Sequence, residues 1–167
     1  YGFGIPFILR YILEFCSTVP EAVKVLQRVP SHMSYNITLA DKSGAYCTVQ
    51  ISPDRKAKVT KAGFATNHQG IIELPADSYL INSKERASYL DSILKKGYAI
   101  EDLTKAFLEP PLYNPHFASG FGTLYTAVYR PLSGLVEFHW PNKKLIQSFE
   151  EFKEGLHVIN YYEQKTT

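Results

Sequence analysis

The chain has 167 residues, of which 45% are hydrophobic and 20% charged, with 18 Lys and Arg against 16 Asp and Glu. This length suits a single domain over residues 1–167, and the composition excludes an intrinsically disordered chain. The net charge of +2 gives no electrostatic reason to expect a nucleic-acid partner. The longest apolar stretch, residues 3–9, is far shorter than the roughly 20 residues of a membrane span, so we expect no span.

Two short helices are predicted at the start of the chain. Apolar residues follow helical spacing over residues 6–15. Thr18 is a good N-cap for a second helix over 19–29, because Glu21 stands where the capping box requires an acidic residue. Two helices in tandem would pack as one layer of a fold.

The pattern then changes to the alternation of polar and apolar residues that is typical of strands. The turn at residues 41–44 looks like a ligand loop in composition, yet it fits a hairpin without any ligand. Turns this short join antiparallel neighbours, so we expect a meander. Its predicted strands lie near residues 35–41, 45–51 and 56–66, with 64–68 as a short buried run.

The second half of the chain alternates long loops, at 69–82 and 109–122, with further regular elements. Ser83 caps a helix that Gly97 ends, and residues 130–134 (RPLSG) are a strong hairpin signal. Because helices and strands come in separate runs, the order favours an α+β fold with helices layered on antiparallel sheets. The predicted elements are helices at 83–96 and 100–108, strands at 123–130 and 135–140, a helical turn at 148–153 and a terminal strand at 157–162.

Cysteine and histidine are the first residues to consider for metal or nucleophilic chemistry. Cys16 and Cys47 form no CxxC pair, and the five histidines show neither HxxxH nor HExxH spacing. We therefore expect no metal site and no bound cofactor, and we interpret both cysteines as reduced, buried packing residues. Reduced thiols fit a cytoplasmic location. Asn36 begins a glycosylation sequon, which we discount because Asn36 lies in a predicted strand.

Asn67 and Arg86 are the two polar residues that most need an explanation. Asn67 ends the predicted buried run, where its amide either caps its own loop or donates to a developing oxyanion. Arg86 lies in the first turn of a helix, where the helix dipole disfavours a cation, so it pairs with a group outside the helix. The residues alone favour a loop cap for Asn67 and a surface salt bridge for Arg86.

Six short motifs occur in a fixed order along the chain. They are CSTVPEAVKVLQRVP at 16–30, SYNITLADKSG at 34–44, FATNH at 64–68, SKER at 83–86, YTAVYRP at 125–131 and HWP at 139–141. Together they resemble the C-terminal part of the linear-amide C–N hydrolases of the N-terminal-nucleophile superfamily. That group includes choloylglycine hydrolase, penicillin V acylase and acyl-coenzyme A:6-aminopenicillanate acyltransferase. The resemblance spans most of residues 4–160.

The resemblance implies an αββα sandwich and an enzyme that hydrolyses or transfers the acyl group of a small acyl-amide substrate. It implies an N-terminal Cys as nucleophile, with its own α-amino group as base. The positions of Asn67 and Arg86 match the family's oxyanion-hole Asn and active-centre Arg, so the resemblance replaces the loop cap and the salt bridge with catalytic roles. We therefore expect the two residues to lie near each other at a cleft, with Asn67 largely buried and its side-chain amide facing that cleft. Cys16 falls inside the helix pair and does not match the nucleophile.

The position of the nucleophile leads to three further expectations. The chain opens on Tyr1 without an initiator Met, and we expect it to be a fragment whose partner is the missing N-terminal half of the same protein. Such a fragment lacks the nucleophile, so we expect it to be inactive alone. It should also expose apolar surface, at residues 1–9 and 123–130, and form a homo-oligomer. The alternative function is a non-catalytic binding or scaffold domain that retains the fold.

Overall fold

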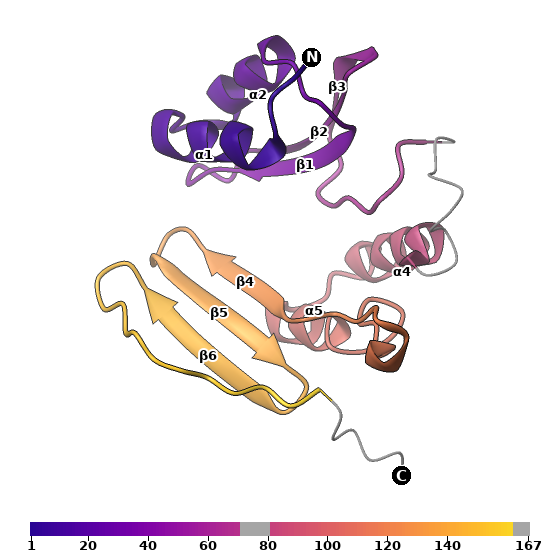
Figure 1. The fold of residues 1–167 in the computed structure, drawn as a ribbon, viewed down its shortest axis with the longest axis vertical. Coiled ribbons are helices and arrows are strands. Elements are labelled where there is room, and N and C mark those ends of the chain that lie inside the picture. Colours follow the sequence, from indigo (N-terminus) through magenta and orange to yellow (C-terminus); the bar gives the residue numbers. More distant parts are fainter. Residues whose placement is uncertain (71–80, 162–167) are drawn as a thin grey trace. The chain divides into compact units, whose positions relative to one another are not determined.

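The computed structural model describes residues 1–70 and 81–161 (Figure 1). The chain divides into two compact units, Tyr1–Leu90 and Asp91–Thr167, each with its own three-stranded sheet. The expected single domain stays a prediction. The elements are α1 (Ile5–Phe15), α2 (Val19–Arg28), β1 (Tyr35–Ala40), β2 (Tyr46–Ser52), β3 (Arg55–Thr60), α4 (Ser83–Lys95), α5 (Ile100–Ala106), η2 (Phe117–Ser119), β4 (Thr126–Arg130), β5 (Leu135–Trp140) and β6 (Lys143–Ser148).

Helices α1 and α2 form where the sequence predicts them, because their ends are satisfied by local hydrogen bonds. The Glu21 carboxylate accepts hydrogen bonds from the backbone N–H groups of Ser17 at 2.8 Å and Thr18 at 3.0 Å. Asp41, in the turn after β1, accepts one from the backbone N–H of Val19 at 2.9 Å. The 41–44 turn therefore binds the N-terminus of α2.

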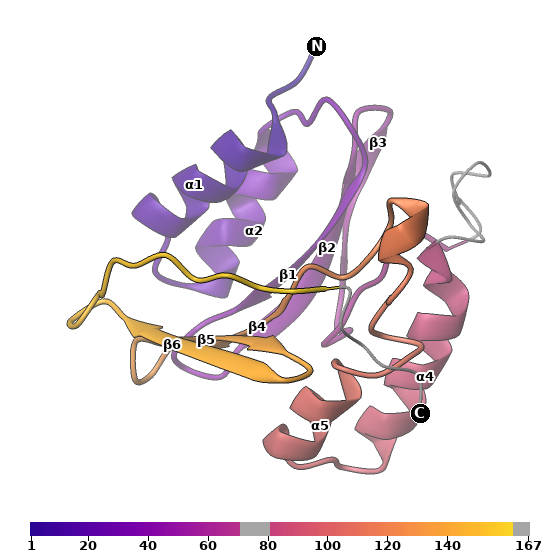
Figure 2. The same cartoon turned by 60° about the horizontal axis from the view of Figure 1, so that its bottom comes forward.

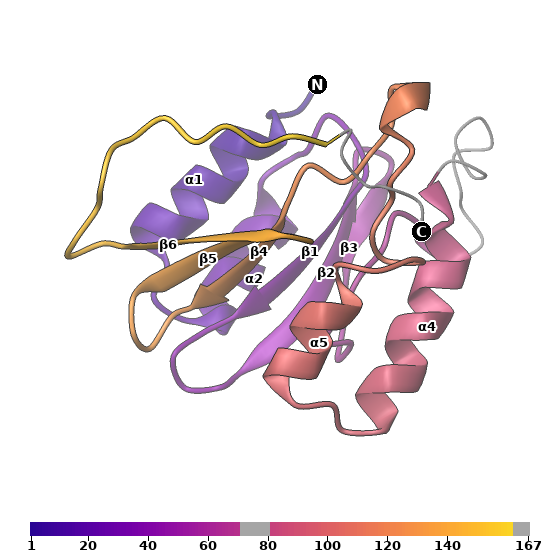
Figure 3. The same cartoon turned by 90° about the horizontal axis from the view of Figure 1, so that it is seen from below.

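Strands β1, β2 and β3 form one antiparallel sheet in that order. Both α1 and α2 cover the same face of it, as Figures 2 and 3 show. Because side chains alternate along a strand, Ile37, Val49 and Cys47 lie buried on the helix side. The opposite face is polar. It carries two cross-strand rows, Asn36–Gln50–Lys58 and Thr38–Thr48–Thr60.

The predicted third strand, near 56–66, is too long, because β3 ends at Thr60. The buried run expected at 64–68 is also wrong, since none of these loop residues is buried: Phe64, Thr66 and His68 are half-buried, and Ala65 and Asn67 are exposed. The reason is that backbone carbonyls of this segment accept hydrogen bonds from polar side chains and not from a neighbouring strand. Thr48 Oγ1 donates to the carbonyl of Ala62 at 2.9 Å, and Asn36 Nδ2 donates to the carbonyl of Thr66 at 2.7 Å.

The second unit contains the predicted hairpin of β4 and β5, and a third strand that the sequence reading missed. Residues after the Pro141–Asn142 turn pair with β5, from Trp140↔Lys143 to Leu135↔Ser148. The helical turn predicted at 148–153 is a bend, and 157–161 is no strand. Side chains hold this segment instead: Gln147 bonds the backbone of Lys153, and Lys143 donates to the carbonyl of Val158. Residue 162 of that prediction lies outside the described residues.

Helices and two antiparallel three-stranded sheets make this an α+β protein. Large apolar side chains are exposed in both stretches where we expected them, including Phe7 at 74% and Tyr129 at 71%. Self-association through them stays a prediction. Within residues 1–70 and 81–161, no helix has the length and apolar composition to cross a membrane.

Candidate functional site

The candidate site lies in the first unit, on the loop between β3 and α4 that carries Asn67. Ser83, the first residue of α4, is buried, and its hydroxyl accepts a hydrogen bond from the backbone N–H of Asn67 at 2.8 Å. The same hydroxyl lies 2.8 Å from Nδ1 of His68 and donates to Thr66 Oγ1 at 3.1 Å. Three consecutive loop residues are therefore bound to one side chain at the start of the helix.

Two side chains bind the same loop to the sheet. Asn36, in β1, donates both hydrogens of its amide nitrogen, to the carbonyls of Thr66 at 2.7 Å and His68 at 2.8 Å. Gln69 is buried and donates to the carbonyls of Tyr35 at 3.0 Å and Ile51 at 3.1 Å. The side-chain oxygen of Gln69, Oε1, accepts a hydrogen bond from Arg55 Nη2 at 2.6 Å. The loop is thus attached to all three strands.

Arg86 and Asn67 are in direct contact, as the sequence predicts. Arg86 Nη2 donates to Asn67 Oδ1 at 2.6 Å, and its Nε donates to the carbonyl of Ile81 at 2.8 Å. Burial lowers the pKa of the Arg86 guanidinium, but an arginine starts high enough to stay charged. None of the carboxylates in the described residues pairs with Arg86, so its charge is directed at the Asn67 amide.

The predicted burial of Asn67 is wrong, since the residue is exposed. Asn67 Nδ2 has no hydrogen-bond partner among the described residues. Asn67 lines a cavity of about 350 Å³ together with Met33, Ser34, Tyr35, Asn36, Thr66 and Gln69.

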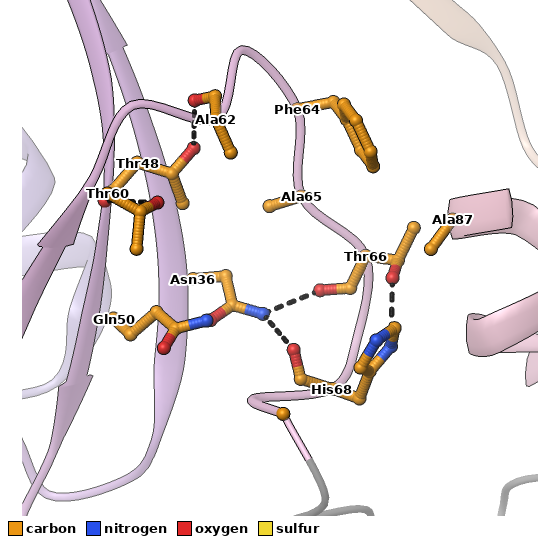
Figure 4. Close-up of a pocket in the computed structure, with 11 residues that line it drawn as sticks. Asn36, Thr48, Gln50, Thr60, Ala62, Phe64, Ala65, Thr66, His68 and Ala87 are labelled. Atoms are coloured by element: carbon orange, nitrogen blue, oxygen red, sulfur yellow. Dashed lines mark hydrogen bonds between the residues drawn. The ribbon is translucent and has the colours of Figure 1, made fainter. Parts of the chain in front are cut away.

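A second, smaller cavity of about 130 Å³ lies over the polar face of the β1–β2–β3 sheet. Figure 4 shows Asn36 and Gln50 on the strand side and Thr66 and His68 on the loop side. Asn36 is common to both cavities. Its Oδ1 is buried and accepts no hydrogen bond from residues 1–70 or 81–161.

Sequence reasoning missed three residues of this site. Asn36 was considered only as a glycosylation sequon, Gln69 was placed in a loop, and Ser83 was interpreted only as a helix cap. One signal was available for Asn36, because it occupies the polar side of an alternating strand, where an amide needs a partner. Nothing in the local pattern indicates that Gln69 spans the ends of two strands.

The described residues contain no cluster of three or more His, Cys, Asp or Glu side chains that could hold a metal ion. Both cysteines are free thiols. Cys47 is buried on the helix side of the sheet, where burial raises the pKa of its thiol. Cys16 is half-buried against the same apolar core. Neither cysteine lines a cavity that contains Asn67 or Asn36.

Comparison with known proteins identifies a family. No curated protein and no solved structure gives a significant match. The family model of acyl-coenzyme A:6-aminopenicillanic acid acyl-transferase matches residues 1–145, which include the Asn67 loop, Arg86 and strands β1 to β5. The match agrees with the motifs in SYNITLADKSG and FATNH, and with a general acyltransferase or hydrolase activity. The chain belongs to the acyl-coenzyme A:6-aminopenicillanic acid acyl-transferase family.

Proposed function

We propose that this chain supplies the oxyanion donor of an enzyme that hydrolyses or transfers the acyl group of a linear amide. Asn67 is the donor, and Arg86 is the residue that orients it. The observation that carries the proposal is the 2.6 Å bond from Arg86 Nη2 to Asn67 Oδ1. The bond engages the amide oxygen of Asn67, which lines a cavity of about 350 Å³, and Nδ2 binds none of the described residues.

This arrangement suits a group that stabilises negative charge. When a nucleophile attacks the carbonyl of an amide, charge develops on the carbonyl oxygen, and a preorganised N–H donor lowers the energy of that state. A charged donor on Oδ1 draws electron density out of the Asn67 amide and so makes Nδ2 a stronger donor. Arg86 also prevents a flip of the amide, because a flip would place NH2 against its guanidinium.

The nucleophile of this proposal is an N-terminal Cys outside this chain, with its α-amino group as base. Two observations on the chain's own thiols support this. Cys47 lies on the opposite side of the sheet from Asn36, and Cys16 packs on the apolar core. We also propose that the protein folds as an αββα sandwich of the choloylglycine hydrolase type, and that the missing N-terminal half is the partner of this chain.

The test is Asn67→Ala in the full-length protein, assayed by amine release from a panel of acyl amides and by acyl transfer to an added amine. Loss of one oxyanion donor slows such enzymes by about 10²–10³-fold. We expect a kcat loss in that range with an unchanged thermal midpoint, because the exposed Asn67 side chain contributes little packing. Asn142→Ala, in the exposed turn before β6, is the matched control.

Three results would contradict this proposal. Full activity of Asn67→Ala would remove the oxyanion role. Activity of residues 1–167 alone that survives alkylation of Cys16 and Cys47 would remove the external nucleophile. Absence of any amide cleavage or acyl transfer by the full-length protein would favour the alternative of a non-catalytic scaffold.

A further inference from the structure

Asn36 holds the backbone on both sides of Asn67. Its Nδ2 donates to the carbonyl of Thr66 at 2.7 Å and to that of His68 at 2.8 Å. These two carbonyls flank Asn67 in the chain, and Figure 4 shows both bonds reaching across from the strand to the loop. Asn36 is 31 residues before Asn67 in the sequence, so this contact exists only in the folded protein.

The orientation of the Asn36 amide follows from these bonds. A flipped amide would place Oδ1 against two carbonyl oxygens and lose both contacts. These two bonds thus fix which end of the Asn36 amide faces the loop.

Two further residues, Ser83 and Arg86, also bind Asn67 in this loop. Ser83 Oγ accepts from the backbone N–H of Asn67 at 2.8 Å, and Arg86 binds its side chain at 2.6 Å. Asn36 fixes the peptide groups on either side, Ser83 fixes the N–H, and Arg86 fixes the amide. Of these three residues, Asn36 alone comes from the sheet, so it links the position of the Asn67 peptide groups to that of β1.

We propose that Asn36 is a positioning residue that places Asn67 for catalysis. The proposal rests on the proposed function of Asn67 as oxyanion donor. Asn36 itself touches no reacting atom. It acts through the two carbonyls, and a shift of the loop by about 1 Å would move Nδ2 of Asn67 out of line, which costs an enzyme up to about 10²-fold in rate.

The experiment compares Asn36→Asp with Gln50→Glu in the full-length protein. Gln50 lies directly opposite Asn36 on the same polar face and makes no side-chain hydrogen bond among the described residues. Both variants exchange an amide for a carboxylate there, but only the first removes donors from the loop. Asn36→Thr is the second variant, because threonine suits a strand, adds no charge and lacks the amide.

The first readout is hydrogen exchange of the Asn67 backbone N–H, followed by NMR and independent of any activity. We expect exchange at least tenfold faster in Asn36→Asp and Asn36→Thr, and unchanged in Gln50→Glu. The second readout is kinetic. We expect kcat to fall about 10- to 100-fold in both Asn36 variants, with KM within about twofold of the unmodified protein.

A pH profile separates positioning from loss of structure. In Asn36→Asp the introduced carboxyl regains one donor when it is protonated, so its kcat defect should shrink as the pH is lowered, while that of Asn36→Thr should not. His68 lines the same cavity and Lys58 pairs with Gln50 across the sheet. Both groups are equally present in the Gln50→Glu control, so their titration cancels in the comparison.

Unchanged exchange of the Asn67 N–H in both Asn36 variants would overturn the proposal, and so would an equal defect in Gln50→Glu. If the unmodified protein cleaves no amide, the proposed function fails while the exchange measurement still decides whether Asn36 holds the loop. Faster exchange with full kcat in an active protein would overturn the positioning role and leave the role of Asn67 intact.

Discussion

Arg86→Lys tests whether the arginine acts through its geometry or through its charge alone. Arg86 uses two different nitrogens, Nε on the carbonyl of Ile81 at 2.8 Å and Nη2 on Asn67 Oδ1 at 2.6 Å. A lysine ammonium keeps the charge but lacks the planar fork that makes both bonds at once. We therefore expect Arg86→Lys to lose the hydrogen bond to Asn67 Oδ1.

The magnitude follows from the bond that is lost. A hydrogen bond to a charged group contributes about 1.5–3 kcal/mol, and water competes for the exposed Asn67, which places this bond near the lower end. About 1.5 kcal/mol corresponds to roughly a tenfold change in rate. We expect kcat of the full-length protein to fall about tenfold in Arg86→Lys, whereas Arg10→Lys, in an exposed ion pair with Glu14, should leave it unchanged.

A double-mutant cycle with Asn67→Ala decides the interpretation. If Arg86 acts through Asn67, then Arg86→Lys should have almost no further effect on kcat once the Asn67 amide is gone. Thermal midpoints of all four proteins, measured by circular dichroism, show whether any of them has lost its fold. Fully additive losses of kcat in the cycle would refute the reasoning, and so would an unchanged kcat in Arg86→Lys.

Two further predictions concern stability. Leu26 is 3% exposed between α2 and the sheet, so Leu26→Ala should lower the free energy of unfolding by about 3 kcal/mol in a urea titration. Leu13 is 83% exposed on α1, so Leu13→Ala should change that free energy by less than about 0.5 kcal/mol. Glu137 is buried, and its hydrogen bond from Arg130 at 2.6 Å is the main reason why its pKa is lowered from the usual 4.5. A carboxyl group whose pKa is lower in the folded than in the unfolded protein stabilises the fold at pH values above the unfolded pKa. That stabilisation is lost as the pH falls through the folded pKa. Glu137→Gln should therefore cost about 1–3 kcal/mol at pH 7, and the difference should shrink as the pH falls below 4.5; a difference independent of pH would contradict this assignment.

Periodic patterns in the sequence predicted most of the helices and strands. Helical spacing identified α1, α2 and α4 within a residue or two of their ends, and alternation identified the meander and the β4–β5 hairpin. Strand β6 was missed because its sequence, KKLIQS, alternates weakly and is a strand only by pairing with β5. The motifs also identified the pair Asn67 and Arg86, whose contact the structure confirms.

By itself, the sequence determined helices α1, α2 and α4, the antiparallel meander and the β4–β5 hairpin, because each depends on residues close together in the chain. Periodicity places Asn36 on the polar face of β1, but it does not show what that face meets. Tertiary structure alone decided that segment 61–69 leaves the sheet, exposes Asn67 and is bound by Asn36 and Ser83, while Gln69 within it binds the strands. The physical reason is that buried amides and hydroxyls must find hydrogen-bond partners, and here those partners lie 14 to 34 residues away in the chain.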